Sequence, residues 1–189
     1  MTANALVSFA LGLLGPFWII YAQNLVGSIE FLGFAVGIRV FSYSLTTYFV
    51  GALSDKFGRV AFIVAGGIIS GVIMLLYTMV TSLTELYILQ TIFGIAGAMQ
   101  VTASTALLGD ITEKNSRGKD VGKMNAATGI AGALAIIVGG IVAGKLGIEA
   151  IFYVIAGFFF ISSALILFMK VVQPREDNTQ QFDNLAQSN

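Results

Sequence analysis

Long runs of apolar residues alternate with short polar breaks along the chain, and this pattern predicts six membrane-spanning helices. Each run holds about 20 largely apolar residues, the length that a helix needs to cross the hydrocarbon core of a bilayer. The predicted spans cover residues 5–24, 31–53, 60–80, 86–108, 121–143 and 149–170. We therefore expect an all-α membrane protein, with one six-helix transmembrane domain over residues 1–172.

The last residues, 173–189, do not continue this pattern. They are rich in Gln, Asn and Asp and contain few apolar side chains. A segment of this kind buries too little apolar surface to offset the entropy lost on folding. We expect it to form a disordered polar tail on the cytoplasmic side.

The distribution of Lys and Arg predicts the orientation in the membrane. An even number of spans puts both termini on one side, and cytoplasmic loops carry an excess of basic residues. The loops on the other side hold only Lys145, whereas the terminal side holds Lys56, Arg59, Lys114, Arg117, Lys119, Lys123, Lys170 and Arg175. This asymmetry predicts a multi-pass protein of the cell membrane with both termini in the cytoplasm.

Composition supports the membrane assignment and narrows the function. Of the 189 residues, 57% are hydrophobic and 11% are charged, whereas a soluble domain carries roughly 25% charged residues. The absence of His and Cys removes thiolate nucleophiles, His-dependent catalytic triads and His/Cys metal sites. The net charge of zero argues against nucleic-acid binding, which typically relies on an excess of basic residues. We expect neither an enzyme nor a bound cofactor or metal.

The most specific stretch lies between the second and third predicted spans. It reads Gly-Ala-Leu-Ser-Asp-Lys-Phe-Gly-Arg over residues 51–59. We expect Gly51 to end span two, Gly58 to supply a tight turn, and Asp55 to cap the N-terminus of span three. Lys56 and Arg59 add positive charge at the cytoplasmic face. Together these residues predict a charged latch whose ion pairs can break and re-form.

This stretch resembles the G-x-L-x-D-x-x-G-R signature of the major facilitator superfamily, at the position where that family carries it. The stretch 109–118, Gly-Asp-Ile-Thr-Glu-Lys-Asn-Ser-Arg-Gly, is similar to the family's loop after its fourth helix. The resemblance covers residues 1 to about 172 and implies one six-helix half bundle of this fold. It also implies that Asp55, Arg59 and Asp110 form a gate together with a helix of the other half. The alternative is that these residues merely cap helices and fix the topology.

The chain departs from the family pattern in three places. The fourth helix often carries an Arg four residues before a Gly, but Gln90 precedes Gly94 at that distance here. The fifth-helix antiporter pattern has Gly-Pro where this chain has Ala135 and Ile136. Both departures argue against proton antiport. The third departure is length, since the family normally has twelve helices.

One ionisable residue falls well inside a predicted span, and such residues are functional candidates by default. Arg39 lies about eight residues into span two, and Ser42, Tyr43 and Thr46 follow on the same helix face. This polar stripe predicts contact with a cavity or a partner rather than lipid. Arg39 either attracts an anionic substrate group or hydrogen-bonds neighbouring carbonyls to fix helix packing.

Further polar and aromatic residues in the spans are candidates for a substrate cavity. In span four, Gln90 and Gln100 share one face with Gly94, Gly97, Ser104 and Thr105. The resemblance implies that the first and fourth helices line the central cavity. The remaining candidates are Trp18, Tyr21 and Asn125. For each of them, packing between helices is the alternative role.

None of the carboxylates falls in the middle of a predicted span, and His is absent. A buried proton relay usually needs such a group. The sequence therefore favours facilitated diffusion, a different coupling ion, or a partner that supplies the acid.

We expect a secondary transporter that moves small solutes by alternating access and works as a parallel dimer of six-helix halves. Its partners would be the lipid bilayer, an anionic or amphipathic small molecule, and a second copy of the chain. Two alternatives stay open: a half that needs a different partner chain, and a membrane subunit that does not transport. The sequence does not identify the substrate, the direction of transport or a coupling ion.

Overall fold

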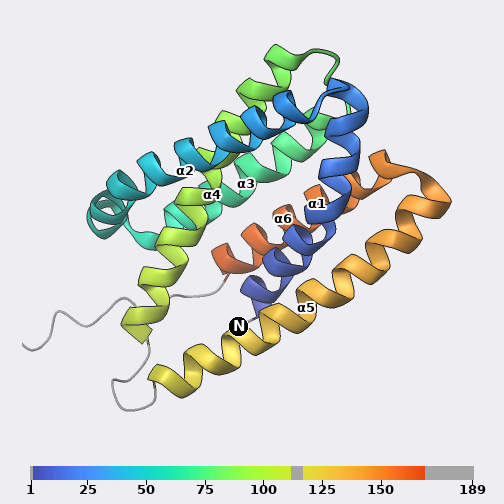
Figure 1. Ribbon diagram of the computed structural model, residues 1–189. Helices are drawn as coiled ribbons and strands as arrows, with labels where there is room; N and C mark the ends of the chain where they lie inside the picture. The colour runs from blue at the N-terminus through green and yellow to red at the C-terminus, as the bar shows by residue number, and fades with distance from the viewer. Residues whose placement is uncertain (1, 112–116, 169–189) are drawn as a thin grey trace, which may run out of the picture.

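Six long helices make up the computed structural model, which describes residues 2–111 and 117–168 (Figure 1). The helices are α1 (Thr2–Val26), α2 (Ile29–Phe57), α3 (Arg59–Tyr77), α4 (Leu83–Ile111), α5 (Arg117–Leu146) and α6 (Ile148–Phe168). Each is long and apolar enough to cross a membrane. The predicted all-α fold with six spans is confirmed. The predicted tail, Lys114, Lys170 and Arg175 lie outside the described residues.

The helices pack as two groups of three. Helix α4 packs against α2 and α3, and α1 packs against α5 and α6, while contacts between α3 and α6 join the two groups (Figure 1). Buried side chains of α3 and α6, including Ile73, Tyr77, Phe152 and Phe159, form much of the apolar core. The described residues therefore form a main apolar core and a second, smaller one, and α3 and α6 contribute to both.

Several of these contacts bring helix backbones close together at Gly. A Cβ atom at Gly12 of α1 would lie 2.6 Å from the carbonyl oxygen of Gly132 in α5. A Cβ atom at Gly66 of α3 would lie 2.6 Å from the carbonyl oxygen of Ala96 in α4. Small residues allow this approach in lipid, where apolar surface alone does not drive helices together.

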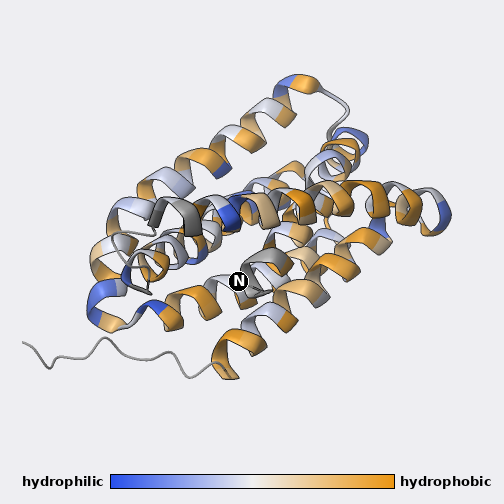
Figure 2. Cartoon of the chain, turned by 90° about the horizontal axis from the view of Figure 1, so that it is seen from below, coloured by the Kyte–Doolittle hydropathy of each residue, from blue (hydrophilic) through white to orange (hydrophobic). Residues whose placement is uncertain are grey.

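The outer surface of the bundle is apolar, as expected for a protein in lipid. Figure 2 shows hydrophobic residues along the lengths of the helices.

The helices differ in how much the bundle itself covers them. In the most apolar stretch of each helix, 11% of α2 and 11% of α5 is buried within the bundle, against 50% of α3 and 44% of α6. Helices α2 and α5 are therefore the most open elements of the structure.

Helix α2 is longer than the sequence pattern predicts. It continues to Phe57, so Gly51 lies inside the helix, and the prediction that Gly51 ends span two is wrong. The apolar run ends near residue 53, but the backbone stays helical because each further turn keeps its hydrogen bonds. Gly58 ends the helix, with a φ of 97° that residues with a Cβ atom rarely adopt.

Candidate gate and substrate cavities

Arg59 joins three helices at one end of the bundle. Its guanidinium group lies 2.9 Å from a carboxylate oxygen of Asp55 in α2 and 2.7 Å from a carboxylate oxygen of Asp110 in α4. Arg59 itself begins α3. We call these three residues the latch, and the end of the bundle that holds them the latch end.

The latch places each charge at the less favourable end of its own helix. Asp55 lies in the last turn of α2 and Asp110 in the last turn of α4, where the helix dipole is negative. Arg59 lies at the N-terminus of α3, where the dipole is positive. Each charge is therefore stabilised by its partners across the latch rather than by its own helix.

This arrangement corrects one prediction about Asp55. Its carboxylate does not cap the N-terminus of α3, where Gly58 is the cap residue and no side-chain cap bond forms. Because α2 continues past residue 53, Asp55 is a helical residue and pairs with the Arg59 side chain instead. Neighbouring Lys56 lies near the ring of Phe57, with its Nζ atom 5.4 Å from the ring centroid.

The latch is weak enough to open. The side chains of Arg59, Asp55 and Asp110 are 22%, 61% and 36% exposed. Ion pairs at such exposure contribute about 0.2–1 kcal/mol each. Thermal energy or modest binding energy is therefore enough to break these ion pairs.

A first cavity of about 300 Å³ lies between α1, α2 and α4, towards the end opposite the latch. It brings together three residues that the sequence analysis picked from separate spans: Trp18, Arg39 and Gln90. Apolar side chains including Leu14, Val36 and Phe93 complete its wall. We call it the outer cavity.

Arg39 is the charged residue of the outer cavity. Helix α2 begins at Ile29, so at 1.5 Å per residue Arg39 lies roughly 15 Å along the helix, about half the thickness of a bilayer's hydrocarbon core of roughly 30 Å. The guanidinium carbon is 5.9 Å from the centroid of the Phe93 ring, within cation–π range. Gln90, which replaces the family's fourth-helix Arg, lines the same cavity. A positive charge is thus present here, but α2 carries it.

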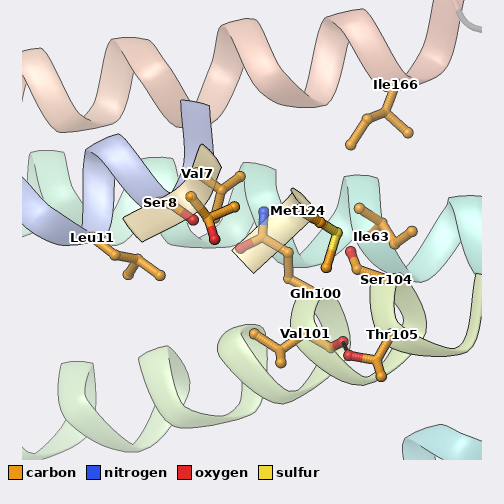
Figure 3. Close-up of a pocket in the computed structure, with 11 residues that line it drawn as sticks. Val7, Ser8, Leu11, Ile63, Gln100, Val101, Ser104, Thr105, Met124 and Ile166 are labelled. Atoms are coloured by element: carbon orange, nitrogen blue, oxygen red, sulfur yellow. Dashed lines mark hydrogen bonds between the residues drawn. The ribbon is translucent and has the colours of Figure 1, made fainter. Parts of the chain in front are cut away.

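A second cavity, of about 200 Å³, lies nearer the latch and is lined mainly by α1, α4 and α5. Its polar lining is uncharged and consists of Ser8, Gln100, Ser104, Thr105 and Thr128. Figure 3 shows Gln100 of α4 reaching towards Ser8 of α1. We call it the inner cavity. Leu11 of α1 lines both cavities, so it marks the boundary between them.

The other predicted cavity residues lie elsewhere. Tyr43 packs on α4, where its ring is 3.6 Å from a Cβ atom placed at Gly97; Thr46 belongs to neither cavity lining. Tyr21 donates a hydrogen bond to the carbonyl oxygen of Tyr77 at the end opposite the latch, where it lines a separate pocket of about 510 Å³. Asn125 is exposed, and its neighbours Met124 and Thr128 line the inner cavity instead.

Ser8 and Leu11 of α1 also line the inner cavity, and neither was predicted. Both lie on the helix face of Trp18, because Ser8, Leu11, Gly15 and Trp18 follow one another at intervals of three or four residues. Extending that spacing backwards from Trp18 would have found them. Ser8 is only weakly polar and Leu11 is apolar, so neither residue gave a separate signal.

Comparison with known proteins agrees with this architecture. The family model described as Major Facilitator Superfamily matches residues 1–187. The uncharacterized MFS-type transporter YitZ of Bacillus subtilis is 30% identical over 159 residues, which cover 84% of this chain and 97% of YitZ.

Two longer relatives match over part of their length. The inner membrane transport protein YajR of Escherichia coli is 31% identical over 154 residues, covering 78% of this chain and 34% of YajR. The multi-drug resistance efflux pump PmrA of Streptococcus pneumoniae is 28% identical over 173 residues, covering 88% of this chain and 43% of PmrA. This chain therefore belongs to the Major Facilitator Superfamily of membrane transporters.

Proposed function

We propose that the chain forms one half of a secondary transporter that moves small solutes across the cell membrane by alternating access, without ATP. The observation that carries this proposal is the pair of polar cavities along α1 and α4, with a breakable latch at one end. In transporters of this superfamily, substrate binds near mid-membrane between two halves related by an axis along the membrane normal. The outer cavity with Arg39 lies near that depth.

The second half of the carrier is a second copy of the same chain in the same orientation. The outer cavity is bounded by α2 and the inner cavity by α5, and these are the two most open helices. A face that carries the half-buried Arg39 and several hydroxyl groups is costly to leave against lipid. A two-fold axis along the membrane normal would bring two such faces together around one pathway.

Alternating access follows from the latch. With Arg59 paired to Asp55 and Asp110, the end of α4 is held to the α2–α3 turn, and we expect this state to restrict access to the inner cavity from the latch end. Loss of the Asp110 pair frees the end of α4 and opens the inner cavity. Both termini and the latch end face the cytoplasm, in line with the excess of basic residues there.

The first experiment counts subunits of the purified chain in lipid nanodiscs by native mass spectrometry. We expect a homodimer, and we expect the same preparation in liposomes to pass small organic solutes that empty liposomes retain. A strict monomer without flux overturns the homodimer, and flux that appears only with a second, different chain identifies a hetero-partner. A homodimer without flux for any solute of the panel supports a membrane subunit that does not transport.

A further inference from the structure

The outer cavity contains a donor and an acceptor that have no partner in the structure. The Nε atom of Arg39 and the Oε1 atom of Gln90 are both buried and make no hydrogen bond. Gln90 is only 1% exposed, so its oxygen cannot be satisfied by bulk water. Buried polar groups are rarely left unpaired in proteins, because each loses its hydration without compensation.

The charge of Arg39 is also uncompensated among the described residues. It takes part in neither of the ion pairs of the latch, which are the ones found there. The carboxylates whose side chains the structure describes lie in the first or last turns of helices, and none of them forms an ion pair with Arg39: Glu30, Asp55, Glu85, Asp110 and Glu149. A guanidinium group away from bulk water is costly unless an anion pairs with it.

The walls of the cavity define the rest of the ligand. Leu14, Ile19 and Val36 supply apolar surface, and Phe93 lies against the guanidinium group. A ligand that satisfies the site carries an anionic oxygen for the Arg39 N–H and, beside it, an O–H or N–H donor for Gln90 Oε1. Its remaining part is apolar and small enough for a cavity of about 300 Å³.

We propose that the outer cavity binds small amphipathic organic anions, with a carboxylate on Arg39 and a neighbouring hydroxyl or amide N–H on Gln90. This assigns a substrate class to the proposed transporter and so rests on the proposed function. Arg39 supplies selection by charge. Gln90 selects for a donor next to the carboxylate, because an anion without that donor leaves its oxygen unpaired.

Trp18 provides a direct readout of binding, because it is the one tryptophan of the chain and lines this cavity. We would titrate the purified chain in detergent with bromine-labelled quenchers of tryptophan fluorescence that share one aromatic body. The set is 4-bromobenzoate, neutral 4-bromobenzamide, cationic 4-bromobenzylamine, and 4-bromomandelate, which inserts a CH(OH) group, and so a hydroxyl beside the carboxylate, between ring and carboxylate. We expect saturable quenching by the two anions, with 4-bromomandelate the tighter, and weak linear quenching by the neutral and cationic probes.

Two substitutions assign the contacts. Arg39→Gln should weaken binding of both anions at least about tenfold, as expected for loss of a charge-assisted hydrogen bond, and Arg39→Lys should retain part of it. Gln90→Leu should remove the preference for 4-bromomandelate while leaving 4-bromobenzoate little changed. Lys145→Gln is the matched control, since it removes one positive charge from the exposed end of α5. Circular dichroism checks that each variant is folded.

Equal quenching by charged and neutral probes, or unchanged anion binding in folded Arg39→Gln, would overturn the anion site. Such a result would mean that the probes partition into detergent or that water alone fills the cavity. Because the titration needs no flux, it separates the two proposals. Anion binding without transport refutes the transporter and leaves the site, whereas flux of neutral solutes that is unaffected by Arg39→Gln refutes the site and leaves the transporter.

Discussion

Gly94 and Gly97 lie one turn apart on α4, and both face α2, yet their surroundings differ. A Cβ atom at Gly94 would clash with the backbone carbonyl oxygen of Arg39. A Cβ atom at Gly97 would meet only the Tyr43 ring, at an ordinary contact distance of 3.6 Å. The backbone cannot move aside as a flexible side chain can. Of these two positions, therefore, Gly94 is the one at which the observed separation of α2 and α4 requires the absence of a side chain.

We expect Gly94→Ala to destabilise the protein by about 1–3 kcal/mol, the usual range for overpacking. Gly97→Ala on the same helix is the control, and it should be neutral or slightly stabilising because Ala favours helix more than Gly does. Thermal unfolding in detergent measures both. Equal midpoints for the two variants would show that α2 is not held against α4 at Gly94.

At the scale of the elements, the latch connects α4 to the turn between α2 and α3. The two ion pairs of Arg59 differ in what they join. Asp55 is four residues away along the chain, across the break at Gly58, whereas Asp110 belongs to a helix that approaches from elsewhere in the sequence. Only the Asp110 pair links the end of α4 to the rest of the latch.

Loss of the latch should therefore open the inner cavity at the latch end. The chain has no native Cys, so Ser104→Cys gives a single reporter in that cavity. We expect Arg59→Gln to speed its labelling by a membrane-impermeant maleimide roughly fivefold, because two exposed ion pairs contribute about 1 kcal/mol together. Asp110→Asn should act almost as strongly and Asp55→Asn less. Labelling rates that are the same in all three variants as in the unsubstituted protein would contradict a gating role. Lys145→Gln is the control for a general effect of charge.

At the scale of the whole molecule, α2 and α5 are open while α3 and α6 are largely covered. In a parallel homodimer, α2 and α5 would lie at the subunit interface and the outward faces of α3 and α6 would meet lipid. Exposure alone does not distinguish the two environments, since Tyr48 of α2 is 81% exposed and Ile161 of α6 is 54% exposed. Lipid and a second protein surface are both apolar.

Single Cys residues can separate these environments in native membranes. We expect a flexible bifunctional maleimide, which does not require the two Cys residues to lie on the two-fold axis, to cross-link Tyr48→Cys or Ile137→Cys, on the open helices α2 and α5, into dimers. Ile161→Cys on α6 should stay monomeric under the same conditions. Cross-linking at Ile161→Cys alone would place the interface on α6 and refute the proposed arrangement, in which the cavities lie between the copies.

The sequence by itself determined the number of spans and much of the latch. Lipid forces each backbone polar group to bond within its own helix, so length and apolarity suffice to predict a span. Asp55 and Arg59 were identified from a local motif because charges are rare in such a chain, and the family resemblance added Asp110. Helix ends were predicted less well, since Asp55 and Lys56 are polar but still helical.

Only the tertiary structure decided which polar residues share a cavity. Trp18, Arg39 and Gln90 come from three helices, and their meeting depends on the packing of α1 and α2 against α4. Tyr21 and Asn125 have similar chemistry, yet they lie away from both cavities. Helical periodicity fixes the face on which a residue lies, but not the helix that this face meets. That choice depends on close contacts such as those at Gly12 and Gly94, which form only when segments distant in sequence pack together.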